Sequence, residues 1–233
     1  MLGVIINTVT VLLGSAVGLL LKKGIPERFN QAVMTAIALC TLCIGVTGTL
    51  KGENTLVMIL SMVCGTIVGT LLELDGFLGG IGQRIEARLK HRGGGAGITE
   101  GFVTASLLFC IGAMTLVGAL EAGLNGDHRM LITKSMLDLV SSCMLSVSLG
   151  FGVMLSAGFV FVFQGALVLL AQLLAPVLTA SAIAEITCVG SLMILAIGTN
   201  LLGVTKIKVA DMLPALLFAP VFVWLFSLLP FAI

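Results

Sequence analysis

Residues 2–21 read LGVIINTVTVLLGSAVGLLL, a run of 20 residues without a charged side chain. An α-helix needs about 20 apolar residues to cross the hydrocarbon core of a bilayer, so this stretch predicts a membrane-spanning helix. No basic residue precedes the run, and it is longer than the apolar region of a typical signal peptide. We therefore expect this first span to insert and to remain in the membrane.

Seven further apolar runs follow, separated by charged or turn-forming residues. They place spans near residues 31–50, 55–73, 101–120, 134–156, 158–178, 184–204 and 211–231. The weakest separation is Ser156-Ala157-Gly158, where we expect a tight turn because the apolar stretch around it is too long for one crossing. The sequence thus predicts an all-α bundle of about eight transmembrane helices, forming a single domain over residues 1–233.

The composition identifies the bilayer as the surrounding medium. Hydrophobic residues make up 58% of the chain, charged residues only 10%, and the mean hydropathy is +1.21. A soluble domain carries roughly 25% charged residues, so lipid is the expected partner of this surface. A net charge of +1 gives no basic surface that could neutralise a run of phosphates, which argues against nucleic acid as a partner.

The basic residues predict the orientation. If the N-terminus lies outside, nine of the twelve Lys and Arg residues fall in cytoplasmic loops and three outside. The cytoplasmic set is Lys22, Lys23, Arg28, Arg84, Arg88, Lys90, Arg92, Lys206 and Lys208, and the outer set is Lys51, Arg129 and Lys134. Cytoplasmic loops are enriched in basic residues, so we expect both termini outside.

Residues 74–97 are the one sizeable segment predicted outside the membrane. Apolar residues recur every four positions, at Phe77, Ile81, Ile85 and Leu89, among clustered basic residues. This pattern predicts an amphipathic helix over residues 77–92 on the cytoplasmic interface, followed by a glycine-rich link at 93–97. Two roles are open for this helix: it anchors the topology of the protein, or it is a docking site for a partner.

The sequence contains a weak internal repeat. Ile44-Gly45, Ile111-Gly112 and Ile197-Gly198 each fall late in an apolar run. Spans one to three and spans six to eight would start from opposite sides of the membrane, so a repeat between them would be inverted. Inverted repeats are typical of secondary transporters.

One predicted span carries a polar stripe. Lys134, Ser135, Asp138 and Ser142 recur at helical spacing, and Lys134 and Asp138, four residues apart, are placed to form an ion pair. An acidic residue within a span is a functional candidate by default. The alternative reading is that small and hydroxyl side chains serve helix packing. In both cases the stripe should face the bundle interior.

Three amides lie well inside predicted spans: Asn7, Gln164 and Asn200. With the serine stripe they favour a polar cavity between spans one, five, six and seven, although interhelical hydrogen bonding would explain each amide alone. Two acids, Glu185 and Asp211, sit near predicted helix starts, where first-turn carboxylates have an ordinary structural role.

Glycines four residues apart mark close helix contacts. Gly14 and Gly18 lie on one face of the first predicted span, and Gly65 and Gly69 on one face of the third. This spacing lets helices approach closely, either within one subunit or between two copies in a homo-oligomer.

The sequence contains no motif of a known enzyme, metal or cofactor site. The two histidines form no HExxH pair, no glycine-rich phosphate loop carries its lysine, and all six cysteines fall in apolar runs. We therefore expect no metal, no cofactor and no enzymatic activity.

Several phrases of the chain resemble a known family. They are Asn7 with the later run Lys22-Lys23-Gly24-Ile25-Pro26-Glu27-Arg28, Ala105 to Met114, Gly126-Asp127 followed by Lys134-Ser135 and Asp138, and Lys206 to Ala215. This pattern resembles the prokaryotic membrane family called domain of unknown function 554, or YqgA/YdfK, over essentially the whole chain. The resemblance implies a multi-pass protein of the bacterial cytoplasmic (inner) membrane and carries over no activity. At Asp211 the family pattern has Asn, which weakens a catalytic role there.

Two functions follow from these patterns. The first is transport of a small solute or ion, with Asp138 as the charged member of the site and Asn7, Gln164 and Asn200 as neutral ligands. The alternative is a non-transporting interaction or assembly factor that uses the 77–92 helix.

Overall fold

The computed structural model describes residues 1–22, 27–77, 98–110 and 113–228. Within these ranges the chain forms helices and no strand, which confirms the all-α prediction. The elements are α1 (Leu2–Lys22), α2 (Glu27–Thr49), α3 (Thr55–Leu71), α5 (Ile98–Cys110), α6 (Ala113–Leu124), α7 (Arg129–Leu149), α8 (Phe151–Leu169), α9 (Ala171–Leu174), α10 (Ala180–Leu201), the 3-10 helix η2 (Val209–Met212) and α11 (Ala215–Ser227).

Five segments are long and apolar enough to cross a membrane: α1, α7, α8, α10 and η2 with α11. The pair α5 and α6 has the length and composition of a sixth span, but the two helices differ in direction by 59°. A bent pair therefore replaces the single helix predicted over residues 101–120. Because α3 and the Met34–Thr49 part of α2 are shorter apolar helices, the count of eight spans stays a prediction. The inverted repeat also stays a prediction.

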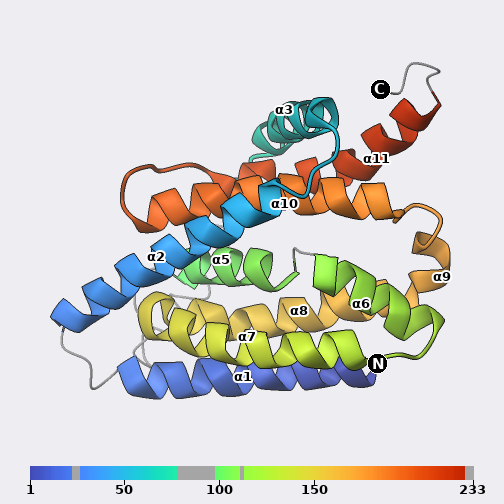
Figure 1. The fold of residues 1–233 in the computed structure, drawn as a ribbon. Coiled ribbons are helices and arrows are strands. Elements are labelled where there is room, and N and C mark those ends of the chain that lie inside the picture. Colours follow the sequence, from blue (N-terminus) through green and yellow to red (C-terminus); the bar gives the residue numbers. More distant parts are fainter. Residues whose placement is uncertain (23–26, 78–97, 111–112, 229–233) are drawn as a thin grey trace.

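The helices form two groups that alternate along the chain (Figure 1). The first bundle contains α1, α5, α6, α7 and α8, with α1 packed along α7 and α8, and α5 along α8. The second bundle contains α2, α3, α10 and α11, with α2 packed along α10 and α3 along α11. Between the bundles, packing is sparser and involves α2 against α7 and α10 against α5 and α6.

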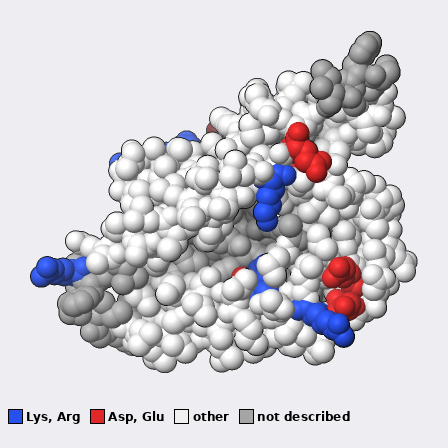
Figure 2. Space-filling view, in the orientation of Figure 1, with Lys and Arg blue, Asp and Glu red and all other residues white. Residues whose placement is uncertain are grey.

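Large apolar side chains cover the outside of both bundles. Leu20 on α1, Val162 on α8 and Leu217 on α11 are 72%, 66% and 74% exposed. Most of the face in Figure 2 is uncharged, with few basic or acidic side chains. Soluble proteins rarely expose large continuous apolar surfaces, so this surface suits contact with lipid.

The glycine pairs mark close contacts within the chain. A Cβ added at Gly14 or Gly18 of α1 would run into the backbone carbonyls of Leu139 or Cys143 on α7. Gly65 of α3 lies in the same way against Ala215 of α11, and the neighbouring Gly69 lies against η2. The predicted close approach is therefore between helices of one subunit, and a homo-oligomer stays a prediction.

The turn predicted at Ser156-Ala157-Gly158 is wrong. The chain reverses at Gly150, between α7 and α8, and residues 156–158 lie inside α8. Gly150 has φ 73° and ψ −147°, a conformation open almost only to glycine. The Ser156 hydroxyl donates to the Val153 carbonyl at 2.6 Å, so its polarity is satisfied within a continuous helix. α7 also begins at Arg129, which puts Lys134 inside the helix rather than in a loop.

Two buried carboxylates hold the ends of α3. Glu185 of α10 accepts at Oε1 from the backbone N–H groups of Glu53 and Asn54, at 2.7 and 2.6 Å, just before α3 begins. Asp211 of η2 accepts at Oδ1 from the N–H of Asp75, at 2.8 Å, just after α3 ends. These acids therefore bind another segment's backbone, whereas the sequence placed them as first-turn acids of their own helices.

The predicted interfacial segment is described only at its start. Residues 74–77 are helical, and Phe77 is exposed. The rest of the predicted 77–92 helix and the glycine-rich link at 93–97 lie outside the described residues.

Candidate functional site

The polar stripe of α7 faces the interior of the first bundle. Lys134, Ser135, Asp138 and Ser142 are each at most 6% exposed, on one face of the helix. The Lys134 ammonium forms an ion pair with Asp138 Oδ2, as the four-residue spacing indicates. It is the one ion pair between side chains of the described residues.

The lysine has a second favourable neighbour on α5. Its Nζ lies 6.0 Å from the centre of the Phe109 ring, within the range of a cation–π contact. Phe109 belongs to the last turn of α5, and the carbonyl end of a helix carries partial negative charge. The site thus surrounds a buried cation with an anion and an aromatic face.

Fold stability alone does not explain this buried ion pair. Removing two charges from water costs several kcal/mol per ion, and a well-packed apolar pair of similar volume is often as stable or more so. Charged residues within membrane spans are correspondingly rare and mark functional sites by default. Lys134 and Asp138 are therefore the strongest candidates for a function in the described chain.

Two of the three predicted amides join this site. Asn7 of α1 donates from Nδ2 to Oε1 of Gln164 on α8, at 3.2 Å, and both side chains are fully buried. The Asn7 side chain also lies close to the Asp138 carboxylate. The other amide atoms, Asn7 Oδ1 and Gln164 Nε2, have no partner among the described residues. Both keep bonding capacity for another group.

The serines of the stripe serve mainly the helix itself. Ser135 donates to the Leu131 carbonyl at 2.7 Å and Ser142 to the Leu139 carbonyl at 3.0 Å. Ser142 also faces Gly14 of α1 at the closest approach of the two helices. This arrangement favours a helix-packing role for the serines. The ion pair and the two amides remain as the groups that could bind a solute.

A cavity of about 340 Å³ lies beside the pair, between α2, α5 and α7. Asp138 lines it together with Cys40 and Thr41 of α2, Phe109 of α5 and Ser141 of α7. We call it the Asp138 cavity. Figure 2 shows this face of the molecule hollowed between the α2 side and the α7 side. A solute in the cavity would reach the carboxylate from the boundary between the two bundles.

Asn200 lies elsewhere and does not contribute to this site. It ends α10, where Nδ2 donates to the Ile207 carbonyl at 2.8 Å and Oδ1 accepts from Thr205 at 2.7 Å and from the Ile207 N–H at 2.8 Å. The Asn200 amide therefore holds the loop after α10, which explains its polarity without a solute.

The sequence did not identify the residues that α2 and α5 bring to the site. Phe109 and Cys40 read as ordinary apolar residues, because their contribution depends on packing between helices far apart in the chain. In the sequence, residues 109–112 (FCIG) contribute only Ile111-Gly112 to the possible internal repeat, and they give no sign of a site.

Known proteins resemble this chain over nearly its full length. Residues 2–224 match the family described as "Protein of unknown function (DUF554)". The "Uncharacterized membrane protein YdfK" of Bacillus subtilis (strain 168) is 33% identical over 228 residues, which cover 96% of each chain. The "Uncharacterized protein YqgA" of Escherichia coli (strain K12) is 30% identical over 221 residues, which cover 94% of each chain. No solved structure matches. The chain is a membrane protein and belongs to the DUF554 family.

Proposed function

We propose that this protein transports a small solute or ion across the membrane, using the Lys134–Asp138 pair as the centre of its site. The observation that carries the proposal is a buried ion pair beside a cavity at the boundary of two helix bundles. Intramembrane charges of this kind line substrate and ion pathways. Asp138 is the charged ligand, or the proton carrier if transport is coupled to protons.

The packing of the helices supports an inverted repeat, which transporters commonly contain. Each of α1, α2 and α3 packs against the helix at the matching place in the second half, namely α8, α10 and α11. Residues 42–45 of α2 (LCIG) and 195–198 of α10 (LAIG) agree at three of four positions. Leu42 lies against Gly198, and Leu195 against Gly45. Such reciprocal contacts are what a two-fold axis between the halves requires.

The Asn7–Gln164 bond fits the same arrangement. It joins α1 to α8, the first helices of the two triplets, beside Asp138. Transporters with inverted repeats bind their substrates at the interface of the repeats. The repeat therefore supports the same location for the site as the buried charges do.

We further propose a bacterial cytoplasmic membrane as the location, with both termini outside. Lys134 is buried inside α7 and no longer counts as an outer-loop residue. The cytoplasmic loops then hold nine basic residues and the outer loops two, Lys51 and Arg129. The bias expected of cytoplasmic loops is thereby strengthened.

Flux into proteoliposomes tests the transport proposal. We expect a panel of radiolabelled Na⁺, Rb⁺, methylammonium and amino acids, with a pH-sensitive dye, to reveal protein-dependent uptake of at least one solute. Asp138→Asn should abolish that uptake because the amide is neutral and cannot take up a proton. Glu53→Gln, at an exposed carboxylate in the α2–α3 turn, is the matched control and should retain it.

A folded protein that moves none of these solutes would count against transport. It would favour the alternative of an interaction factor that uses residues 77–92. Thermal unfolding and size-exclusion profiles of each variant in detergent separate loss of flux from loss of fold.

A further inference from the structure

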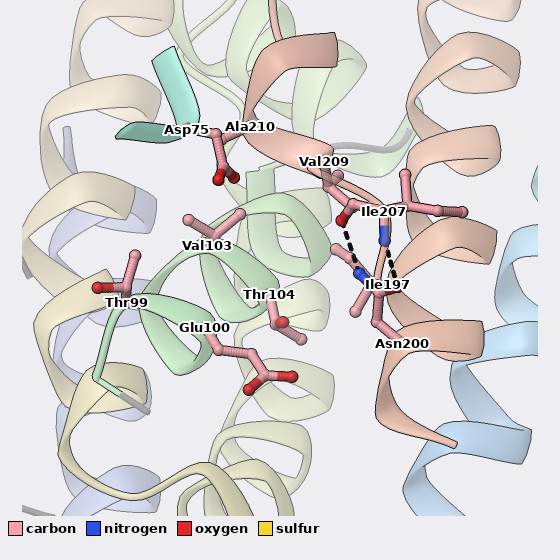
Figure 3. A pocket seen from close by; sticks show the side chains of 10 residues that line it. All are labelled: Asp75, Thr99, Glu100, Val103, Thr104, Ile197, Asn200, Ile207, Val209 and Ala210. Carbon is pink, nitrogen blue, oxygen red and sulfur yellow. Dashed lines mark hydrogen bonds between the residues drawn. The ribbon is translucent and has the colours of Figure 1, made fainter. Parts of the chain in front are cut away.

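A second cavity, of about 260 Å³, lies between the bundles where α5 begins and α10 ends. We call it the Glu100 cavity. Its lining comes from the first two turns of α5, the last turns of α10, Ile207 with the start of η2, and Asp75 after α3 (Figure 3). This is the end of the molecule that the distribution of basic residues assigns to the cytoplasm.

Two carboxylates give the Glu100 cavity its charge. Figure 3 shows Asp75 and Glu100 on opposite sides of Val103. Neither carboxylate has a salt-bridge partner in the described part of the chain, and no lining residue is basic. The N-terminal turn of α5 and the C-terminal turn of α10 contribute opposite dipole ends, so the carboxylates set the sign. The lining is acidic.

A buried hydroxyl adds a neutral ligand to the same wall. Thr104 lies one turn after Glu100 on α5 and is only 2% exposed, yet it lines the cavity. Its hydroxyl has no hydrogen-bond partner among the residues described, whereas most other buried threonines bond to a carbonyl of their own helix. The hydroxyl is therefore free to bind a group in the cavity.

The two cavities share a wall of α5. Leu108, one turn beyond Thr104, lines the Asp138 cavity, so Glu100, Thr104 and Leu108 follow one face of the helix from one cavity to the other. The two cavities therefore follow one another along this face of α5.

We propose that the Glu100 cavity binds a small monovalent cation through Asp75, Glu100 and Thr104, which makes cations the substrate class of the pathway. This inference rests on the proposed transport function. No three His, Cys, Asp or Glu side chains of the described chain are grouped to hold a metal ion, so the lining does not suit a dehydrated divalent cation. A water molecule takes about 30 Å³, which leaves room for a partly hydrated cation or a protonated amine.

The charge of the cavity is measured with thiol reagents. We would place Thr104→Cys in a variant whose six native cysteines are replaced, and purify it in detergent. A cationic aminoethyl and an anionic sulfonatoethyl methanethiosulfonate are then compared. A cleft of one charge raises the arrival rate of the opposite charge by 10–10³, so neutralising both acids should lower the cationic-to-anionic rate ratio about tenfold.

The controls use the same chain. Asp75→Asn with Glu100→Gln supplies the neutralised cavity, and Thr133→Cys, exposed on α7 at the other end of the molecule, should show no change in ratio. Thr99→Cys is a second reporter in case Thr104→Cys fails to fold. An unchanged ratio at both reporters would overturn the proposal.

Binding itself is measured as protection of the Thr99→Cys reporter, which lines the same cavity and keeps Thr104 as a ligand. Sodium chloride and methylammonium chloride are compared with N-methylglucamine chloride at equal ionic strength. Protection by sodium identifies an inorganic cation as the ligand, and protection by methylammonium identifies a protonated amine. Charge selectivity without protection by either would mean attraction without a binding site, and would overturn the proposal.

This assay does not depend on flux. Protection in a protein that transports nothing would keep the cation site and reject the transport function. Flux of a panel solute without protection would keep transport and reject the Glu100 cavity as a cation site.

Discussion

Lys134 and Asp138 depend on one another because each charge is buried. Removing only the lysine leaves a carboxylate without its partner in the bundle, and breaking a buried pair in this way costs about 3–5 kcal/mol. We expect Lys134→Met to lower the unfolding free energy by that amount in detergent. The double variant Lys134→Met with Asp138→Leu should regain most of the loss, because an apolar pair is tolerated at this site.

Calorimetry or denaturant titration of the four proteins checks this coupling. Lys51→Met, at an exposed lysine in the α2–α3 turn, is the control and should have little effect. Flux should be absent from both the single and the double variant. Flux in the double variant would assign the pair a structural role only.

The residues themselves show how far the sequence could predict the site. The four-residue spacing of Lys134 and Asp138 was sufficient, because an α-helix alone brings those side chains together. Asn200 does not lie beside Asp138 but lines the Glu100 cavity, and the sequence does not show that the loop after α10 folds back onto its amide. Glu185 and Asp211 were misplaced for the same reason. Their partners lie more than 130 residues away, at Asn54 and Asp75.

At the level of elements, the corrected turn makes a direct prediction. Gly150 adopts a conformation that costs other residues about 1–3 kcal/mol, so Gly150→Ala should destabilise the protein by that amount. Gly158 lies inside α8, and an added Cβ meets nothing within 4 Å. Gly158→Ala should therefore be neutral, or stabilising by up to about 1 kcal/mol. Thermal unfolding of both variants measures the contrast, and a reversed order would restore the turn to residues 156–158.

Contact between α1 and α7 makes a second prediction at this scale. A Cβ at Gly14 would overlap the Leu139 carbonyl and the Ser142 hydroxyl, and overpacking of this kind costs roughly 1–3 kcal/mol. We expect Gly14→Ala to be destabilised to that extent at every protein concentration, since the contact is within one subunit. Gly165→Ala on α8, whose Cβ would meet only Met1 at 3.7 Å, is the control. A loss that disappears on dilution would instead assign the motif to an oligomer.

Helix positions were predictable where apolar length decides them, as in α1 and α10. The change of direction between α5 and α6 was not, because the apolar run over 101–120 is continuous and contains no proline. The end of α7 was missed because Gly150 and Gly158 read alike in the sequence. Only the backbone distinguishes a glycine in a turn from one in a helix.

At the scale of the whole molecule, the alternation of the chain between two bundles has a mechanical consequence. The bundles are each well packed, while the boundary between them holds both cavities and less contact. Transporters with inverted repeats move solutes by rocking one bundle against the other around a fixed site. Under the proposed transport function, the contact of α2 with α7 beside Asp138 is where relative motion is expected.

A cross-link across that boundary tests the motion. Cys40 of α2 and Ser141 of α7 both line the Asp138 cavity, so Ser141→Cys with the native Cys40 gives a pair that spans the bundles. A short bifunctional methanethiosulfonate should join them and stop flux, and reduction should restore it. The control is Gly52→Cys with native Cys188, where the new Cβ would lie 2.7 Å from the Cys188 sulfur within the second bundle. A disulfide there should leave flux intact, because both cysteines move with one bundle. If flux continues through a Ser141→Cys protein that is quantitatively cross-linked to Cys40, the two bundles do not move apart during transport, and the solute must pass along a fixed channel between them.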